Sequence, residues 1–205
     1  MGGGKELVFA QERWTWENCR EDLRRLRGRM GFGEEVRFLG LRLSLEDGAI
    51  YDELRGRPYP RDQLRWERIY CLLTFYSRAE PVPETSRLAT HKQLKGGEYC
   101  PDMTAERSKS LLLQRFGSRG ERLVEAAKVL GGSEVKVGYG DYAVRLRSLP
   151  LIPLTLVLTL ADEEFPASLE ILFDESVSHY LNAEQVGMLV GLTAERLKDA
   201  DELLG

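Results

Sequence analysis

Residues 150–182 read PLIPLTLVLTLADEEFPASLEILFDESVSHYLN, and this stretch decides the fold that the sequence predicts. Two apolar runs, residues 152–160 and 169–173, flank an acidic corner, and short apolar runs bounded by proline are typical of β-strands. The apolar character of residues 154–160 indicates a central strand that is covered on both faces. The run from Leu149 to Leu160 is too short, and too interrupted by proline, to span a bilayer.

Hydrophobic periodicity predicts the other elements. Expected helices cover residues 6–30, 62–78, about 102–116 and 118–130, and a last helix begins after Asn182, where Gln185 completes a capping box. Expected strands cover residues 36–45, 49–54, 134–139 and 141–147, with Asp47-Gly48 as a hairpin turn and residues 55–61 and 84–101 as irregular connections. This order predicts a single α+β domain with an antiparallel, meander-like sheet flanked by about five helices. We expect residues 1–35 to form an amphipathic helix that packs on the domain of residues 36–205.

The composition narrows the class of protein. Of 205 residues, 42% are hydrophobic and 30% charged, with a net charge of −4, which is typical of a soluble globular protein. Residues 1–130 hold 24 Lys and Arg against 20 Asp and Glu, whereas residues 131–205 hold 5 against 13. Arginines interleaved with glutamates favour an ion-paired surface over an anion-binding face. Because the dense basic stripe of nucleic-acid-binding proteins is missing, we expect no nucleic acid as partner. Because the longest apolar run cannot span a bilayer, we expect no membrane as partner either.

The cysteines and the first residues predict a cytoplasmic location. Cys19, Cys71 and Cys100 are far apart and form no close pair, so the sequence contains no disulfide framework and favours a reducing compartment. The segment after Met1 is charged and amphipathic, unlike the apolar core of a signal peptide.

The acidic corner is the first candidate site. Asp162, Glu163 and Glu164 leave the end of a buried strand, Phe165 follows them, and Asp174 closes the next strand. Clustered carboxylates can bind a divalent metal through their oxygens, or act as acid and base when their pKa values differ. The alternative is a solvated turn whose charges prevent aggregation at the edge of the sheet. If the two strands that flank this turn pair with each other, we expect Asp174 at the opposite edge of the sheet from the other acids.

Two further candidate sites contain histidine. His91 and Lys92 precede Gly96-Gly97 and Tyr99, and a glycine pair beside basic residues can present backbone N–H groups to an anion, although an ordinary polar loop has the same composition. His179, one turn before the last helix, is a candidate ligand or proton donor with the carboxylates before it, or else a surface residue. No zinc-ligand spacing, phosphate-binding loop or nucleophile elbow is present, so the sequence assigns no cofactor.

Three segments carry a resemblance to a known family: FLGLRLSLEDGAIYDE (38–53), LKGGEY (94–99) and PLIPLTLVLTLADEEFPASLEILFDESVSHYLNAEQV (150–186). The chain resembles the domain of unknown function 3786 family over residues 36–200, most densely over 150–190. That family typically has a proline-flanked apolar strand, a Gly/Ala-Asp-Glu-Glu-Phe-Pro turn, an Ile-Leu-Phe-Asp strand and an acidic helix start. Here these motifs correspond to residues 153–160, 161–166, 171–174 and 181–184.

The resemblance implies little about chemistry. The family is bacterial and archaeal and concentrated in anaerobes, and some members are fused to a cysteine-rich iron–sulfur module. Three scattered cysteines cannot ligate a four-cysteine cluster in one protomer. An association with anaerobic redox or corrinoid metabolism is therefore an implication of the resemblance alone.

Three hypotheses for the function remain open. The first is an accessory domain that binds a small ligand or a protein partner at residues 162–165 and at the loop of residues 91–99. The second is an enzyme in which Asp162, Glu163 or Glu164 acts as general base or as ligand of a divalent metal, with a histidine as the second group. The third is a homo-oligomeric scaffold built on the aromatic helices, for which a homodimer is the simplest form.

Overall fold

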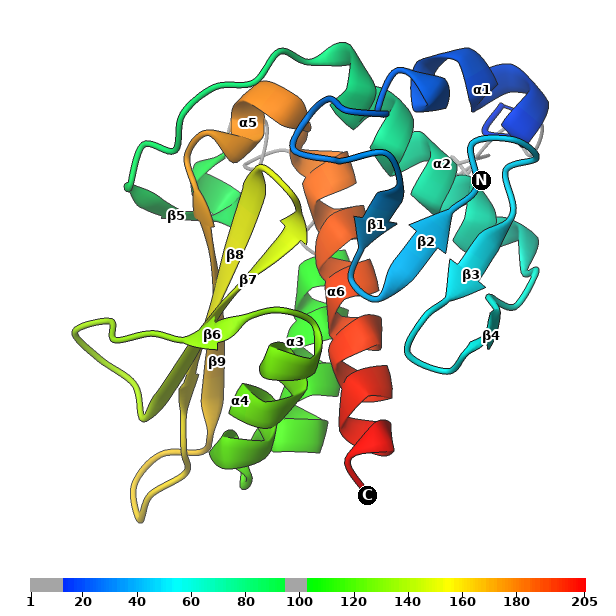
Figure 1. Ribbon diagram of the computed structural model, residues 1–205. Coiled ribbons are helices and arrows are strands. Elements are labelled where there is room, and N and C mark those ends of the chain that lie inside the picture. Colours follow the sequence, from blue (N-terminus) through cyan, green and yellow to red (C-terminus); the bar gives the residue numbers. More distant parts are fainter. Residues whose placement is uncertain (1–12, 95–102) are drawn as a thin grey trace, which may run out of the picture.

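A long helix, α6, lies between two antiparallel sheets in the computed structural model, which describes residues 13–94 and 103–205 (Figure 1). The helices are α1 (Trp16–Arg24), α2 (Gln63–Arg78), α3 (Met103–Phe116), α4 (Gly120–Val129), α5 (Val177–Tyr180) and α6 (Ala183–Leu203), with one 3-10 helix, η1 (His91–Gln93). The strands are β1 (Val36–Phe38), β2 (Leu41–Leu43), β3 (Ile50–Asp52), β4 (Arg57–Pro58), β5 (Leu88–Thr90), β6 (Ser133–Glu134), β7 (Tyr142–Leu149), β8 (Ile152–Thr159) and β9 (Ser168–Asp174). The chain is the α+β domain that the sequence predicts, with its strands divided between two sheets. In the described part of the chain, no helix combines the length and the apolar character needed to cross a bilayer.

The five-stranded sheet confirms the prediction of a central strand at residues 154–160. Its strand order is β5-β9-β8-β7-β6, all neighbours are antiparallel, and every residue of β8 except Thr159 is buried. Helices α3, α4 and α6 lie on one face of this sheet (Figure 1). On the other face, Val135 and Val137 pack against a small buried cluster of β-strand side chains. Burial on both faces explains why the sequence of β8 shows no polar alternation.

The four-stranded sheet differs from the expected pairing. The predicted single strand over residues 36–45 is wrong, because the chain reverses at Leu39 and Gly40 and forms the hairpin of β1 and β2. Both turn residues have positive φ, 49° and 68°, as two-residue hairpin turns require. A Cβ atom on Gly40 would lie 2.6 Å from Leu54 Cγ, so only glycine fits there. The turn at Asp47-Gly48 and the antiparallel return through β3 are confirmed.

Three further expectations are corrected. The predicted helix over residues 6–30 ends at Arg24, since the chain turns there and Gly28 takes a positive φ; residues 6–12 lie outside the described residues. The region 84–101, expected to be irregular, contains the edge strand β5. The predicted strand over 134–139 is reduced to β6, after which the chain leaves the ladder and places its two valines over the sheet.

Helix α6 begins as the sequence predicts. The side chain of Asn182 accepts a hydrogen bond from the Gln185 N–H at 3.0 Å, and the Gln185 side chain accepts one from the Asn182 N–H at 3.0 Å. This reciprocal pair satisfies two of the donors that a helix start leaves unpaired. The helix then runs past both sheets, so the buried side chains of α6 connect the two sheets.

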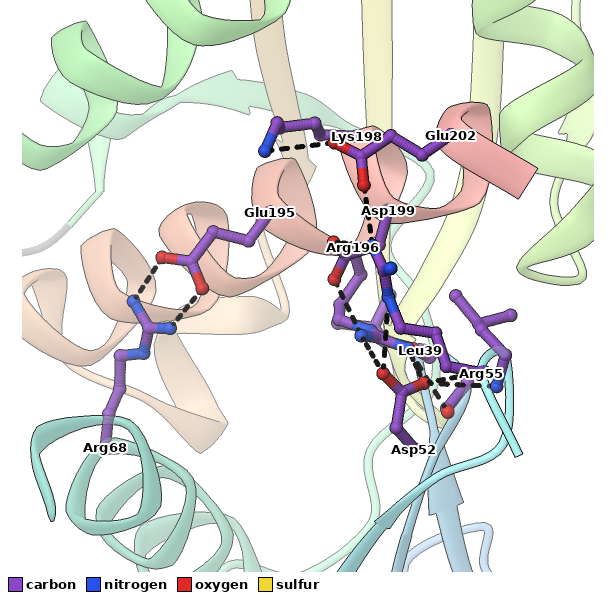
Figure 2. Close-up of polar contacts among 11 residues, drawn as sticks. Leu39, Asp52, Arg55, Arg68, Glu195, Arg196, Lys198, Asp199 and Glu202 are labelled. Atoms are coloured by element: carbon purple, nitrogen blue, oxygen red, sulfur yellow. Dashed lines mark hydrogen bonds and ion pairs between the residues drawn. The ribbon is translucent and has the colours of Figure 1, made fainter. Parts of the chain in front are cut away.

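The buried Arg196 joins α6 to the four-stranded sheet (Figure 2). Its guanidinium donates to both carboxylate oxygens of Asp52, at 2.6 and 3.2 Å, and to Asp199 at 2.7 Å. It also donates to the carbonyl oxygens of Leu39, at 3.0 Å, and Gly40, at 3.4 Å. All of these partners except Asp199 belong to the small sheet and its turn, so one side chain fixes the sheet on the helix.

Other arginines tie α6 to the neighbouring helices. Asp201, which is fully buried, accepts hydrogen bonds from Arg115 of α3 and, at 2.7 Å, from Arg122 of α4. Arg68 of α2 forms a two-pronged pair with Glu195, at 2.7 and 3.2 Å (Figure 2). Part of the acid excess near the end of the chain therefore pairs with arginines from before residue 131 along α6.

We predict that Arg196→Met lowers the free energy of unfolding by about 3–5 kcal/mol, because Asp52 would remain buried without its partner. Urea unfolding followed by circular dichroism measures the change. Arg25→Met, which removes the exposed pair with Asp22, is the matched control and is expected to change stability by about 0–1 kcal/mol. Equal losses of unfolding free energy in the two variants would show that the buried pair stabilises the fold no more than the exposed pair does.

Candidate functional site

The structure distributes the candidate site residues over three places. The acidic turn of residues 162–165 lies at the end of the β8–β9 hairpin, and Asp174 with α5 lies at the opposite end of β9 (Figure 1). His91 and Lys92 lie in η1, directly after the strand that pairs with β9. Tyr99 falls outside the described residues. The separation of Asp174 from the acidic turn agrees with the register expected from the sequence.

The acidic turn uses its first carboxylate to hold itself together. One oxygen of Asp162 accepts hydrogen bonds from the backbone N–H groups of Glu164, at 2.8 Å, and Phe165, at 2.7 Å. These bonds from Phe165 and Glu164 lower the pKa of Asp162 below its usual value. All residues from 161 to 166 are exposed, including two-thirds of the Phe165 side chain. The turn is ordered, and neither histidine lies at this end of the sheet.

Asp174 anchors the segment that precedes β5. Its buried carboxylate accepts hydrogen bonds from the Thr85 N–H at 2.9 Å, the Thr85 hydroxyl at 3.0 Å, and the N–H groups of Ser86 and Ser176 at 2.7 and 3.0 Å. Burial raises the pKa of Asp174, but the hydrogen bonds from Thr85 and Ser176 outweigh burial and hold that pKa at about 2. Asp174 is thus a permanent anion with its oxygens engaged by the backbone.

His179 also binds the segment that precedes β5. Its Nε2 lies 2.9 Å from the Glu80 carbonyl oxygen, so this nitrogen carries a proton and donates it. The neighbouring Tyr180 hydroxyl bonds both the N–H and the carbonyl of Val82, each at 2.9 Å. Helix α5 and Asp174 together fasten residues 80–87, which we call the strap, across the end of the sheet.

The His91 region lines a pocket of about 190 Å³. The pocket forms where β5 ends and η1 turns away from β9, next to helix α3. Its lining residues are Thr90, His91, Lys92, Lys109, Glu170, Ile171 and Phe173. The structure therefore adds side chains from α3 and β9 to the histidine and lysine that the sequence singled out.

Each wall of the pocket is held by its own contacts. The His91 ring is buried, and its Nε2 lies 2.8 Å from the Ala183 carbonyl oxygen at the start of α6, which makes Nε2 the protonated nitrogen. The Thr90 N–H donates to the Gln93 side chain at 2.8 Å, which fixes η1. Ile171 and Phe173 belong to the main hydrophobic core. The pocket is thus formed by packed elements before any ligand arrives.

The charged groups of the pocket come from different elements. Lys92 is exposed on η1, and Lys109, on α3, is half-buried and pairs with Glu106 at 3.1 Å. Glu170 accepts a hydrogen bond from the Tyr139 hydroxyl at 2.6 Å, which raises the pKa of that tyrosine to about 12. Lys92 and Lys109 therefore line the pocket from two elements, and lysines in such a place can hold the polar end of a small ligand.

A second hollow, of about 310 Å³, is a weaker candidate. Its lining residues all come from one short stretch, residues 31–37. Its cation, Arg37, already contacts Glu35 at 2.7 Å and Glu53 at 3.4 Å, and Phe32 packs edge-on against Tyr76. The cation of the hollow is therefore already paired, and its walls come from a single short stretch.

Sequence reasoning missed Lys109 and Glu170 as pocket residues and Arg196 and Asp201 as buried charges. No local signal marks the first two, since their proximity to His91 arises from the pairing of β5 with β9. Arg196 did carry a signal: it lies three residues after Thr193, on the inward stripe of α6, where an arginine needs buried partners.

Comparison with known proteins gives one match. A family model described as Domain of unknown function (DUF3786) matches residues 30–196. No curated protein and no solved structure matches the chain. The matched range includes the pocket, the strap and the acidic turn.

We predict that Asp174→Asn destabilises the protein by about 2 kcal/mol at pH 7, because an ionised carboxylate held at a pKa near 2 loses its hydrogen bonds. The unfolded carboxyl titrates near pH 4, so this stabilisation is complete above pH 4 and is lost as the pH falls towards 2. Thermal unfolding of both proteins between pH 7 and pH 2 should show the difference shrink below pH 4. Glu163→Gln, in the exposed turn, serves as control; a difference between wild type and Asp174→Asn that stays constant across this range would contradict the assignment.

Proposed function

The chain belongs to the DUF3786 family, and we propose that it is a binding domain whose ligand, a small molecule, occupies the pocket formed by η1, α3 and β9. The observation that carries this proposal is that two lysines from separate elements, Lys92 and Lys109, line one pocket whose β9 wall is packed into the core. Two ammonium groups can fix the polar end of a small ligand.

The size of the pocket supports a small ligand. Drug-sized molecules fill pockets of about 300–1,000 Å³, whereas this pocket measures about 190 Å³. Its β9 wall is packed into the core, because Phe173 is fully buried, and its η1 wall is held by the bond between the His91 ring and Ala183. A preformed site of this volume suits a compact metabolite, which needs little ordering of the protein when it binds.

Binding is favoured over catalysis because the candidate acid–base groups are either held by backbone hydrogen bonds or, like Glu163 and Glu164, exposed in the acidic turn. One oxygen of Asp162 accepts two hydrogen bonds within its own turn, and Asp174 accepts hydrogen bonds from backbone donors. His179 donates to a backbone carbonyl. Within residues 13–94 and 103–205, no three histidine, cysteine or acidic side chains are grouped as metal ligands. The enzyme, the oligomeric scaffold, the cytoplasmic location and the link to anaerobic redox metabolism stay predictions from the sequence.

The experiment is a screen of small polar compounds against the ¹⁵N-labelled full chain by NMR. We expect hits to shift the amide resonances of Thr90, Lys92 and Ile171. The variant Lys109→Trp fills the pocket from α3 and is expected to abolish these shifts while keeping the melting temperature. Lys128→Trp, an exposed position on α4, is the matched control and is expected to bind like the wild type.

Two results would refute the proposal. One is a screen in which no compound perturbs the pocket resonances. The other is a set of ligands whose binding survives in Lys109→Trp, since these ligands would occupy another part of the molecule.

A further inference from the structure

We propose that Arg145 and Arg147 of β7 form a binding site for an oxyanion, and that Glu84 of the strap occupies this site as an intramolecular ligand. These three residues differ from those that line the pocket, so the inference goes beyond the proposed function. The observation that carries it is one carboxylate group held between two guanidinium groups of a single strand.

The alternation of side chains along β7 brings the two arginines together. Val144 and Leu146 belong to the main core beneath the helices, so Arg145 and Arg147 point to the other face of the sheet. One carboxylate oxygen of Glu84 accepts a hydrogen bond from Arg145, and the other accepts one from Arg147 at 2.7 Å. The two guanidinium groups therefore hold the carboxylate in the way that paired donors hold a free oxyanion.

The arginine pair is accessible, and one of its members is oriented without Glu84. A second N–H group of Arg147 donates to the carbonyl oxygen of Pro150 at 2.9 Å, and this bond holds the guanidinium independently of the strap. The side chains of Arg145 and Arg147 are 36% and 55% exposed, so an ion from the solvent can reach both. The site therefore does not depend on the carboxylate that now fills it.

The charges of the site favour an oxyanion with two negative charges. Among the residues that the structure describes, Arg145 and Arg147 each form an ion pair with Glu84 alone, so two positive charges share one negative charge. A dianion compensates both positive charges and is attracted more strongly than a single carboxylate. The planar donors of arginine fit the oxygens of phosphate and of carboxylates alike, so the shared chemistry of the ligand is that of an oxyanion.

Glu84 can leave the site while the strap stays attached. The strap is fastened to Asp174 through Thr85 and Ser86, and these bonds do not involve the Glu84 side chain. Rotation of that side chain therefore frees both arginines. Ion pairs between partly exposed groups contribute little to stability, so a ligand of higher charge can displace the carboxylate.

NMR titration of the ¹⁵N-labelled full chain with phosphate and with malonate, at constant ionic strength and a pH at which both are mainly dianions, tests the inference. Glu84→Gln removes the charge of the intramolecular ligand and should lower the dissociation constant of the bound anion about ten-fold, because the site is then free. The amide shifts should centre on Arg145 and Arg147. Adding Arg147→Gln to Glu84→Gln removes one of the two guanidinium groups and should reverse this gain. Glu84→Asp keeps the charge on a shorter side chain and should give an intermediate dissociation constant.

Two controls isolate the site. Glu80→Gln removes an exposed carboxylate of the same strap and should bind both anions like the wild type. Lys109→Trp fills the pocket and should also leave anion binding unchanged, so a failure of this inference does not affect the proposed function. The anion that binds more tightly identifies phosphates or carboxylates as the ligand class. If Glu84→Gln binds neither anion, or binds them no more tightly than the wild type, Glu84 is only a structural partner of the two arginines and the inference is overturned.

Discussion

A charge inside the hydrophobic core holds this fold together. Arg196 is fully buried, and the structure surrounds it with the carboxylate of Asp52 and the two carbonyl oxygens of the Leu39–Gly40 turn. An ion in such a place is tolerated only where each of its donors finds an acceptor, so the small sheet can sit on α6 in one position only. That requirement also accounts for the turn, because the left-handed conformation of Leu39 directs its carbonyl oxygen to the guanidinium. The hairpin of β1 and β2 and the placement of the small sheet on α6 therefore both depend on the contacts of Arg196.

The same chemistry recurs along α6 and explains the uneven charge of the sequence. Glu195, Asp199 and Asp201 each meet an arginine from the first two-thirds of the chain. These acids of the last third of the chain and arginines of the earlier part contact one another where α6 meets its neighbours.

The elements that the sequence predicts well are those with strong local signals. The apolar run of β8 and the Asn182–Gln185 capping box depend on neighbouring residues only, and both are confirmed. The hairpin at Leu39 was missed because the leucines around it keep an alternating pattern through the turn, and only the buried arginine at residue 196 reveals that the chain must reverse. Strand β5 was missed because its partner lies more than eighty residues away and Asp174 fixes its approach. The pocket contains residues of both kinds. The sequence singles out His91 and Lys92, whereas only tertiary packing brings Lys109 and Glu170 beside them.

The strap has a consequence for the motion of the molecule. Polar bonds to Asp174, His179 and Tyr180 fasten it, and most of its side chains face solvent, so little apolar area resists its detachment. Segments of this kind open locally at a lower free energy than the core around them. The strap continues directly into β5 and then into η1, so opening of the strap loosens one wall of the pocket while α3 and β9 stay in place. Slow amide exchange in β9 beside fast exchange in residues 80–90 would be the signature of such a hinged wall. A hinged wall would give the ligand proposed above a way in that leaves the rest of the fold undisturbed.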